Sequence, residues 1–271
     1  MTPGSHIQPG PKLAEGMTAD IHALDSGRVL KLFKAGRPAS SVDREYDISR
    51  KVHEAGVAAP AVYDIATVGD RRGIIYERAG GSPMADWQLA LPWELVRRAR
   101  LLARLQANLH AVTVSGLPSQ RAELERKIRA AHLTSEPQKE TALRLLHGLP
   151  DGNILCHGDF HPANVILGRN GPLIIDWADA TSGHPLADVA RTSLLLRHGS
   201  LHSRPGIRRV AIRWIATLFH RFYLRRYLRL TGADASDIEK WHTVIAAARL
   251  NEGIIAEEKQ LLSIVSAGGS H

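Results

Sequence analysis

The sequence is nearly free of cysteine, because Cys156 is the one cysteine among 271 residues. A single cysteine cannot close a disulfide within the chain or build a zinc site from cysteine ligands. This excludes the class of small disulfide-stabilised secreted domains and agrees with a reducing compartment. We interpret Cys156 as a small buried apolar residue.

Long apolar runs are also missing. No stretch of about 18 apolar residues occurs, which is the length that a membrane-spanning helix needs. The first residues, MTPGSHIQPGPKL, lack the basic and then apolar layout of a signal peptide. We therefore expect a soluble, cytoplasmic protein with no membrane partner. The 44% hydrophobic content suffices for one large core or two smaller ones.

Acidic residues and lysine are absent from the segment 189–230, which holds ten arginines in a chain with a formal net charge of +8. Such a basic segment could attract a phosphate backbone. Within it, apolar residues recur at helical spacing and predict the buried face of a helix: Ile207, Val210, Trp214, Leu218 and Phe222. The arginines at 208, 209, 213 and 221 would lie on the other faces. We favour a core helix with a solvated basic back, and a nucleic-acid-binding module remains the alternative.

Several catalytic motifs are missing as well. The chain has no G-x-x-x-x-G-K-[ST] phosphate loop, no G-x-G-x-x-G fingerprint and no G-x-S-x-G turn. These absences argue against P-loop nucleotide hydrolysis, dinucleotide-dependent redox chemistry and serine hydrolase chemistry.

The character of the chain changes near residue 80. Short apolar runs, separated by turns such as DSG and GDRRG, predict strands over 20–24, 28–33, 61–68 and 73–77. One helix is predicted from SSVDREYDISRKVHEAG, where Ser40 and Asp43 fit a capping box. Amphipathic segments then predict helices over 92–112, 119–133, 136–147, 186–197, 207–230 and 234–265, the last broken at Gly253. We expect an α+β protein with a small mixed β-sheet lobe over residues 1–80 and a larger, mainly helical lobe over 81–271.

The stretch LCHGDFHPANVILGRNGPLIIDWADA holds the densest group of acid–base and metal-binding side chains. His157 and His161 are four residues apart, but Gly158 and Pro162 make the helix that a zinc site would need improbable. Phosphoryl transfer needs one carboxylate to accept the proton of the attacking hydroxyl and oxygen ligands for Mg²⁺. The side chains that supply this set are Asp159, Asn164 and Asp176.

These residues resemble a known family. The segments HGDFHPAN, IIDWADA and GHPLADVAR follow one another as in the aminoglycoside phosphotransferase and choline kinase-like family, and AEGMTADIHAL resembles its nucleotide-covering strand pair. The resemblance extends over about residues 13–265. It implies a two-lobe protein kinase-like fold and an enzyme that transfers the γ-phosphoryl group of ATP, or of GTP, to a small-molecule alcohol with the help of Mg²⁺.

The resemblance also implies roles for single residues. Asp159 corresponds to the catalytic base, and Asn164 and Asp176 correspond to the magnesium ligands. Lys31 is similar to the lysine that holds the nucleotide phosphates, and Glu45 to the helix glutamate that keeps this lysine charged and oriented. Asp188 is expected to cap the helix that begins in DVARTSLLL.

The resemblance also implies contacts with the nucleotide and with the acceptor at other residues. Further nucleotide contacts are predicted in the first loop and at the hinge IIYERAGG, at Gly16, Thr18, Ala19, Tyr76, Glu77 and Ala79. Predicted acceptor contacts are His161, Trp177 and Glu252. The acceptor itself stays open among aminoglycosides, choline, homoserine, sugars and other alcohols. A pseudokinase-like scaffold that binds nucleotide without turnover is the alternative to an enzyme, and nucleic acid is not an expected partner.

Overall fold

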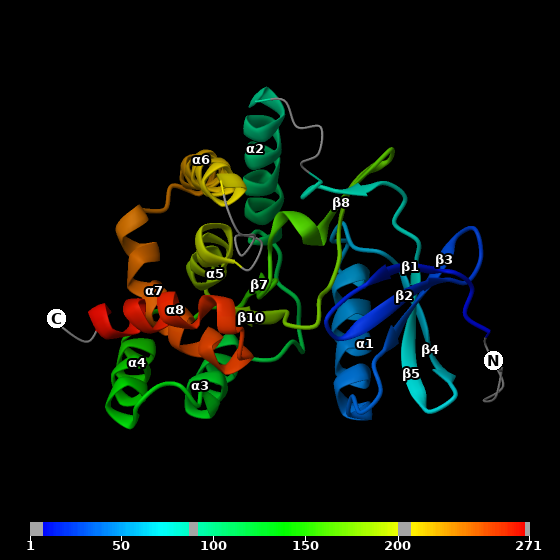
Figure 1. Cartoon of the computed structure of the whole chain (residues 1–271), viewed down its shortest axis with the longest axis horizontal. Coiled ribbons are helices and arrows are strands. Elements are labelled where there is room, and N and C mark those ends of the chain that lie inside the picture. Colours follow the sequence, from blue (N-terminus) through cyan, green and yellow to red (C-terminus); the bar gives the residue numbers. More distant parts are fainter. Residues whose placement is uncertain (1–7, 87–91, 200–206, 269–271) are drawn as a thin grey trace. The chain divides into compact units, whose positions relative to one another are not determined.

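The computed structural model describes residues 8–86, 92–199 and 207–268, and for residues 92 and 207–212 it describes the backbone only. The chain forms two compact units (Figure 1). The first unit comprises residues 1–85 together with 163–179, and the second comprises 86–162 together with 180–271. Among the described residues no helix is long and apolar enough to span a membrane.

The first unit is built on a five-stranded antiparallel sheet with the strand order β1-β2-β3-β5-β4. Its strands are β1 (Lys12–Glu15), β2 (Ala19–Ala23), β3 (Arg28–Phe33), β4 (Val62–Val68) and β5 (Arg71–Glu77). The predicted strands therefore form, with ends shifted by no more than two residues. The helix α1 (Ala39–Glu54) packs against β4 and β5.

Side chains of β3 alternate between the two faces of this sheet, as expected for a strand. Leu30 and Leu32 join one apolar cluster, and Phe33 joins the other with Val42 of α1. Lys31 shares a face with Phe33, because the two residues are two positions apart and side chains alternate along a strand. The alternation therefore turns Lys31 toward α1.

The start of α1 differs from the prediction. Its N-cap is Pro38, which provides no side-chain cap hydrogen bond, so the capping box of Ser40 and Asp43 does not form. Asp43 instead accepts two hydrogen bonds from Arg72 of β5, at 2.7 and 3.0 Å. The helix ends as predicted before Gly56, which has a φ of +76° that favours glycine.

A three-stranded sheet in the order β6-β8-β9 completes the first unit. It consists of β6 (Ser82–Pro83), β8 (Val165–Gly168) and β9 (Gly171–Ile174). The sequence places residues 163–179 in the helical lobe, whereas the structure places them in the first unit. The reason is backbone pairing, because β6 pairs with β8 and the Ile174 N–H donates to the Ala58 carbonyl at 2.7 Å.

The second unit is mainly helical. Its helices are α2 (Pro92–Leu109), α3 (Gln120–Ala130), α4 (Glu136–Gly148), α5 (Pro185–His198), α6 (Ile207–Thr231), α7 (Ala235–Arg249) and α8 (Ile255–Gly268). The short strands β7 (Ile154–Cys156) and β10 (Thr181–Gly183) pair antiparallel beside them. The predicted break at Gly253 is confirmed, since a short 3-10 helix, η3 (Leu250–Glu252), and Gly253 with a φ of +63° separate α7 from α8.

Helix α6 turns a different face inward from the one its apolar spacing predicts. Its buried side chains are Phe219, Tyr223 and Tyr227, whereas Trp214 is 66% exposed and Leu218 is also exposed. Of the four arginines predicted on the other faces, Arg213 and Arg221 have described side chains, and both are exposed as expected. The side chains of residues 207–212 lie outside the described residues.

Candidate active site

The hairpin formed by β8 and β9 brings Asn164 and Asp176 to the same end of the first unit's small sheet. Val165 pairs with Ile174 across the hairpin, and the Ile175 N–H donates to the Asn164 carbonyl at 2.9 Å. Because the strands are antiparallel, residues just before β8 and just after β9 lie side by side. The twelve-residue spacing in the sequence thus becomes spatial proximity.

Asp176 has a left-handed backbone, with a φ of +66°. Among the described residues other than glycine it is the one with a positive φ. Such a conformation costs about 1–3 kcal/mol for a residue with a Cβ atom and persists where the surroundings impose it. Asp176 lies two residues after the end of β9, and its carboxylate pairs with Lys31.

Lys31 bonds to two carboxylates of the first unit. Its Nζ atom lies 2.6 Å from Glu45 Oε1 on α1 and 2.8 Å from Asp176 Oδ1. Burial alone would lower the pKa of Lys31, but the charges of Asp176 and Glu45 outweigh it, so its pKa lies above the ordinary value. The amine therefore stays charged in a half-buried position, where it can hold a polyanion.

Tyr76 belongs to the same group of contacts. Its hydroxyl donates to Glu45 Oε1 at 3.2 Å and lies 3.2 Å from Ser49 Oγ. The tyrosine side chain therefore supports Glu45, and a contact of Tyr76 with a nucleotide stays a prediction.

The other two predicted hinge residues differ in how they are bonded. The Glu77 N–H donates to the Ala61 carbonyl at 2.8 Å, and the Glu77 carboxylate accepts the Ala61 N–H at 3.1 Å. Ala79 is half-buried. Their contacts with a nucleotide stay predictions.

The loop between β1 and β2 is tight. The Gly16 N–H donates to the Ala19 carbonyl at 2.8 Å, and the Thr18 carbonyl accepts the Lys34 N–H at 2.9 Å. A Cβ atom at position 16 would lie 3.1 Å from the Ala19 carbonyl oxygen, so glycine fits this turn best. The turn presents a short stretch of backbone at the edge of the sheet.

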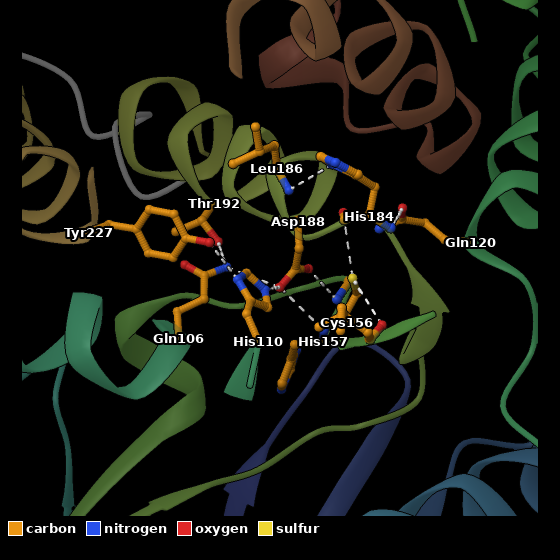
Figure 2. A network of polar contacts seen from close by, with 12 residues as sticks. Gln106, His110, Gln120, Cys156, His157, His184, Leu186, Asp188, Thr192 and Tyr227 are labelled. Atoms are coloured by element: carbon orange, nitrogen blue, oxygen red, sulfur yellow. Dashed lines mark hydrogen bonds and ion pairs between the residues drawn. The ribbon is translucent and has the colours of Figure 1, made fainter. Parts of the chain in front are cut away.

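The loop that carries Asp159 lies in the second unit and is held by Asp188 of α5. The Asp188 carboxylate accepts the N–H groups of Gly158 at 2.7 Å and His157 at 3.3 Å (Figure 2). Gly158 needs its φ of +78° for this turn. The predicted capping role of Asp188 is wrong, because α5 begins at Pro185 and its N-cap is His184, whose Nδ1 accepts the Leu186 N–H.

A buried network of residues from α2, from the turn after it and from α6 supports Asp188. His110 Nε2 donates to the Asp188 carboxylate at 3.1 Å, and Gln106 Nε2 donates to it at 3.0 Å (Figure 2). The Tyr227 hydroxyl oxygen lies 2.7 Å from His110 Nδ1, and the Tyr223 hydroxyl donates to Gln106 Oε1. Burial would raise the pKa of Asp188, but the hydrogen bond and the charge of His110 lead the contributions that hold it below its ordinary value. Asp188 is thus a fixed anion on which the loop rests.

Asp159 projects from this loop and remains partly exposed, at 28% of its side chain. Its Oδ2 atom lies 3.3 Å from His161 Nε2, and its Oδ1 atom accepts a hydrogen bond from Arg191 Nη2 at 3.2 Å. Burial would raise the pKa of Asp159, but the hydrogen bond from His161 and the charge of Arg191 outweigh it and hold it well below its usual range. The group is therefore an ionised, oriented hydrogen-bond acceptor.

The three predicted acceptor contacts have different surroundings. His161 lies beside Asp159 and is partly exposed, which suits the prediction. Trp177 is 2% exposed and donates its indole N–H to the Ile174 carbonyl, so we do not assign it to an acceptor site. Glu252 is bonded to Arg191 and Arg249.

Arg191 is a residue of this site that the sequence reasoning missed. A signal was present, because Arg191 follows Asp188 by three residues, which places both on one face of a helix. Asp188 holds the backbone of residues 157–158, so a side chain one helical turn later on the same face can reach Asp159.

A profile of the phosphotransferase enzyme family matches residues 13–234, well over half of the chain. The chain belongs to the phosphotransferase enzyme family. This match confirms the family expected from the motifs.

Solved structures of this kind of enzyme share the fold. A thermostable mutant of aminoglycoside phosphotransferase APH(4)-Ia has a TM-score of 0.65 at 18% identity, over 96% of this chain and 93% of that one. Amicoumacin kinase hAmiN, in complex with AMP-PNP, Ca²⁺ and Ami, has a TM-score of 0.62 at 16% identity, over 97% of this chain and 89% of that one. The protein kinase-like fold predicted from the sequence is confirmed.

Curated relatives cover a shorter part of the chain. Acyl-CoA dehydrogenase family member 11 of Gallus gallus is 30% identical over 176 residues, which is 56% of this chain and 22% of that protein. The Homo sapiens protein of the same name is 25% identical over 203 residues, or 62% and 26%. The match thus spans about a quarter of these relatives' length.

Proposed function

We propose that the phosphotransferase moves the γ-phosphoryl group of ATP, or of GTP, to a hydroxyl group of a small molecule, with Asp159 as the base. The observation that carries this proposal is Lys31 bonded to both Glu45 and Asp176. A phosphate-binding lysine kept charged by a helix glutamate, next to a carboxylate at a strand end, is the arrangement that phosphoryl transfer requires.

On the nucleotide side, Lys31 would bind the phosphates when Asp176 turns to the metal. The turn at Gly16, Thr18 and Ala19 would cover the phosphates with backbone. The backbone of the hinge at Glu77 and Ala79 would meet the base.

Asn164 and Asp176 fit Mg²⁺ as the metal. They offer an amide oxygen and a carboxylate, the hard donors that Mg²⁺ prefers, and the hairpin brings their backbones together. Among the described residues there is no cluster of three or more His, Cys, Asp or Glu side chains that could hold a metal. The protein side therefore offers an incomplete set of ligands, which nucleotide phosphates would complete. Bound Mg²⁺ offsets charge on the transferred phosphoryl group.

In the transfer step, the acceptor oxygen attacks the γ-phosphorus and a new oxygen–phosphorus bond forms. The bond between the γ-phosphorus and the β,γ-bridging oxygen breaks, and ADP leaves. The hydroxyl proton passes to the Asp159 carboxylate. A base whose pKa is held low is ionised and ready to orient the hydroxyl, and it accepts the proton late in the step.

The proposed acceptor is a small alcohol, and the ligands of the structural relatives are the first candidates. Aminoglycoside phosphotransferases have been solved with hygromycin B and with streptomycin. Choline, homoserine and sugars extend the set to a small cation, an amino acid and neutral polyols.

The test is ADP release from Mg·ATP with each of these acceptors, compared with release in water alone. We expect at least one acceptor to raise the rate above that in water, and a phosphorylated product of matching mass. Binding of ATP without ADP release for any acceptor would instead support a nucleotide-binding scaffold.

A further inference from the structure

Arg191 of α5 joins two carboxylates of the second unit. Its Nη2 atom lies 3.2 Å from Asp159 Oδ1, and its Nη1 atom lies 2.6 Å from Glu252 Oε1. Only 9% of the arginine side chain is exposed. The contact with Asp159 is a hydrogen bond, whereas the contact with Glu252 Oε1 is an ion pair without hydrogen-bond geometry. Because the guanidinium carries its charge and its donors in a rigid plane, it orients the carboxylate of Asp159 while the charge of Glu252 holds it from the other side.

Glu252 is in turn held from behind. Its second oxygen, Oε2, lies 2.8 Å from Arg249 Nη1. Arg249 also bonds to Glu257 through Nε at 2.5 Å and Nη2 at 2.9 Å, and both of these side chains are buried. Glu252 is therefore paired with two arginines, Arg191 and Arg249, and links the ion pair of Arg191 to the buried pair of Arg249 and Glu257.

Exposure distinguishes the base from its support. Asp159 is three times as exposed as Arg191, at 28% against 9%. The guanidinium thus lies on the protein side of the carboxylate and leaves the solvent side accessible to a hydroxyl. Because a charged pair at low exposure is poorly screened, the arginine limits both the rotation and the protonation of Asp159.

We propose that Arg191 is a positioning residue for phosphoryl transfer, that it acts through Asp159, and that Glu252 is its anchor. This rests on the proposed function, in which Asp159 is the base. Arg191 does not need to touch nucleotide or acceptor. Its loss should leave Asp159 present but wrongly oriented, and misplacement by about 1 Å can cost about a hundredfold in rate.

Four variants test the proposal in the full-length chain: Arg191→Gln, Arg191→Lys, Glu252→Gln and Arg121→Gln. Arg121 is the matched control, a second partly buried arginine that bonds to Asp151 at 3.0 Å and to the carbonyls of Leu146 and Leu149. For each variant we would measure the unfolding temperature, Mg·ATP binding by calorimetry, and steady-state transfer. The acceptor is the best one among hygromycin B, streptomycin, choline, homoserine and glucose, with water as the reference.

For Arg191→Gln we expect kcat to fall about 10- to 100-fold while the affinity for Mg·ATP changes less than about twofold. Arg191→Lys should recover part of kcat, because it restores the charge. Arg121→Gln should lower the unfolding temperature, but at temperatures where the variant is folded its kcat should equal that of the parent. Glu252→Gln should lower kcat by a smaller factor than Arg191→Gln and leave the KM of the acceptor unchanged.

Two results would overturn the proposal. One is a kcat of Arg191→Gln equal to that of the parent. The other is a fall in kcat that Arg121→Gln shows to the same extent when the two variants have the same unfolding temperature. A raised acceptor KM with unchanged kcat in Glu252→Gln would overturn the anchor and restore Glu252 as an acceptor ligand. A parent protein that releases no ADP with any acceptor or with water would instead contradict the proposed function itself.

Discussion

Lys31 shows how one residue's position follows from strand geometry. It lies between Leu30 and Leu32, which face the opposite side of the sheet, so it must face α1. There it meets Glu45 at 2.6 Å, and this pair differs from the surface ion pairs in that both side chains are largely buried.

We predict that Glu45→Gln weakens Mg·ATP binding and turnover about 10- to 100-fold, because it removes a charge-assisted hydrogen bond that orients Lys31. The two effects are measured by calorimetry and by ADP release. Far-ultraviolet circular dichroism should match the parent, since glutamine preserves the volume of the side chain.

The control is Asp43→Asn on the same helix. Asp43 also forms an ion pair, with Arg72 at 2.7 Å, but this pair is more exposed than that of Glu45 and Lys31. We expect Asp43→Asn to bind and turn over ATP like the parent. Equal losses in the two variants would show that α1 matters only as a scaffold and that Glu45 has no special role.

Single residues differed in how well the sequence predicted them. Lys31, Glu45 and Asp176 could be proposed from motif spacing, and the structure bonds them to one another. Arg191 was missed, because its spacing from Asp188 indicates only a shared helix face, and its contact with Asp159 depends on a helix and a loop that are 32 residues apart in the sequence. Spacing in a motif predicts local partners, whereas partners from distant elements are fixed by packing.

At the level of elements, α6 shows where periodicity fails. Its apolar residues occur on more than one side, so two faces compete for burial. The buried face is the one with Tyr223 and Tyr227, whose hydroxyl groups contact Gln106 of α2 and His110, the residue that follows α2. Since buried hydroxyl groups need partners, these two polar residues favour the face of α6 that turns inward.

We predict opposite outcomes for two aromatic residues of α6. Phe219→Ala should lower the free energy of unfolding by about 3–5 kcal/mol, because it leaves a cavity in the core. Trp214→Ala should change it by less than about 1 kcal/mol, because that side chain is largely exposed. Urea unfolding followed by circular dichroism measures both. A larger loss in Trp214→Ala than in Phe219→Ala would mean that the helix is turned the other way.

The other elements were largely predictable, because their limits are set by local turn chemistry. The strands of the first sheet follow the alternation of apolar residues between glycine-containing turns, and the break after α7 follows Gly253. The capping box at Ser40 failed because Pro38 already occupies the cap position and Arg72 binds the carboxylate of Asp43. Here a tertiary ion pair replaced a local hydrogen bond to the backbone.

At the scale of the whole molecule, a group of basic side chains links stability to pH. His220 of α6 is largely buried, and its pKa is lowered to about 4, first by burial and then by the charges of Arg197, His242 and His198. The ordinary histidine value is 6.5. Because the folded state disfavours the proton, this contribution to stability is fully present above pH 6.5 and is lost as the pH falls toward 4.

We therefore predict that the free energy of unfolding falls between pH 7 and pH 5, with about 2 kcal/mol of the loss due to His220. The measurement is urea unfolding at both pH values for the parent and for His220→Gln, which cannot take up the proton. The variant should lose less stability over this interval than the parent. An identical loss in both proteins would contradict the link to His220.

The whole account divides the chemistry between the two units. Lys31, Glu45, Asn164 and Asp176 belong to the first, and Asp159 belongs to the second together with Arg191. If the roles proposed for them are correct, nucleotide binding and hydroxyl activation should be separable by mutation.

The most direct test of the central claim is phosphate transfer by Asp159→Asn, measured beside its affinity for Mg·ATP under the same conditions. The account predicts that Mg·ATP binds as in the parent, while transfer to the best acceptor falls about a hundredfold to ten-thousandfold, as for loss of a general base. Transfer at the parent rate by Asp159→Asn would contradict it.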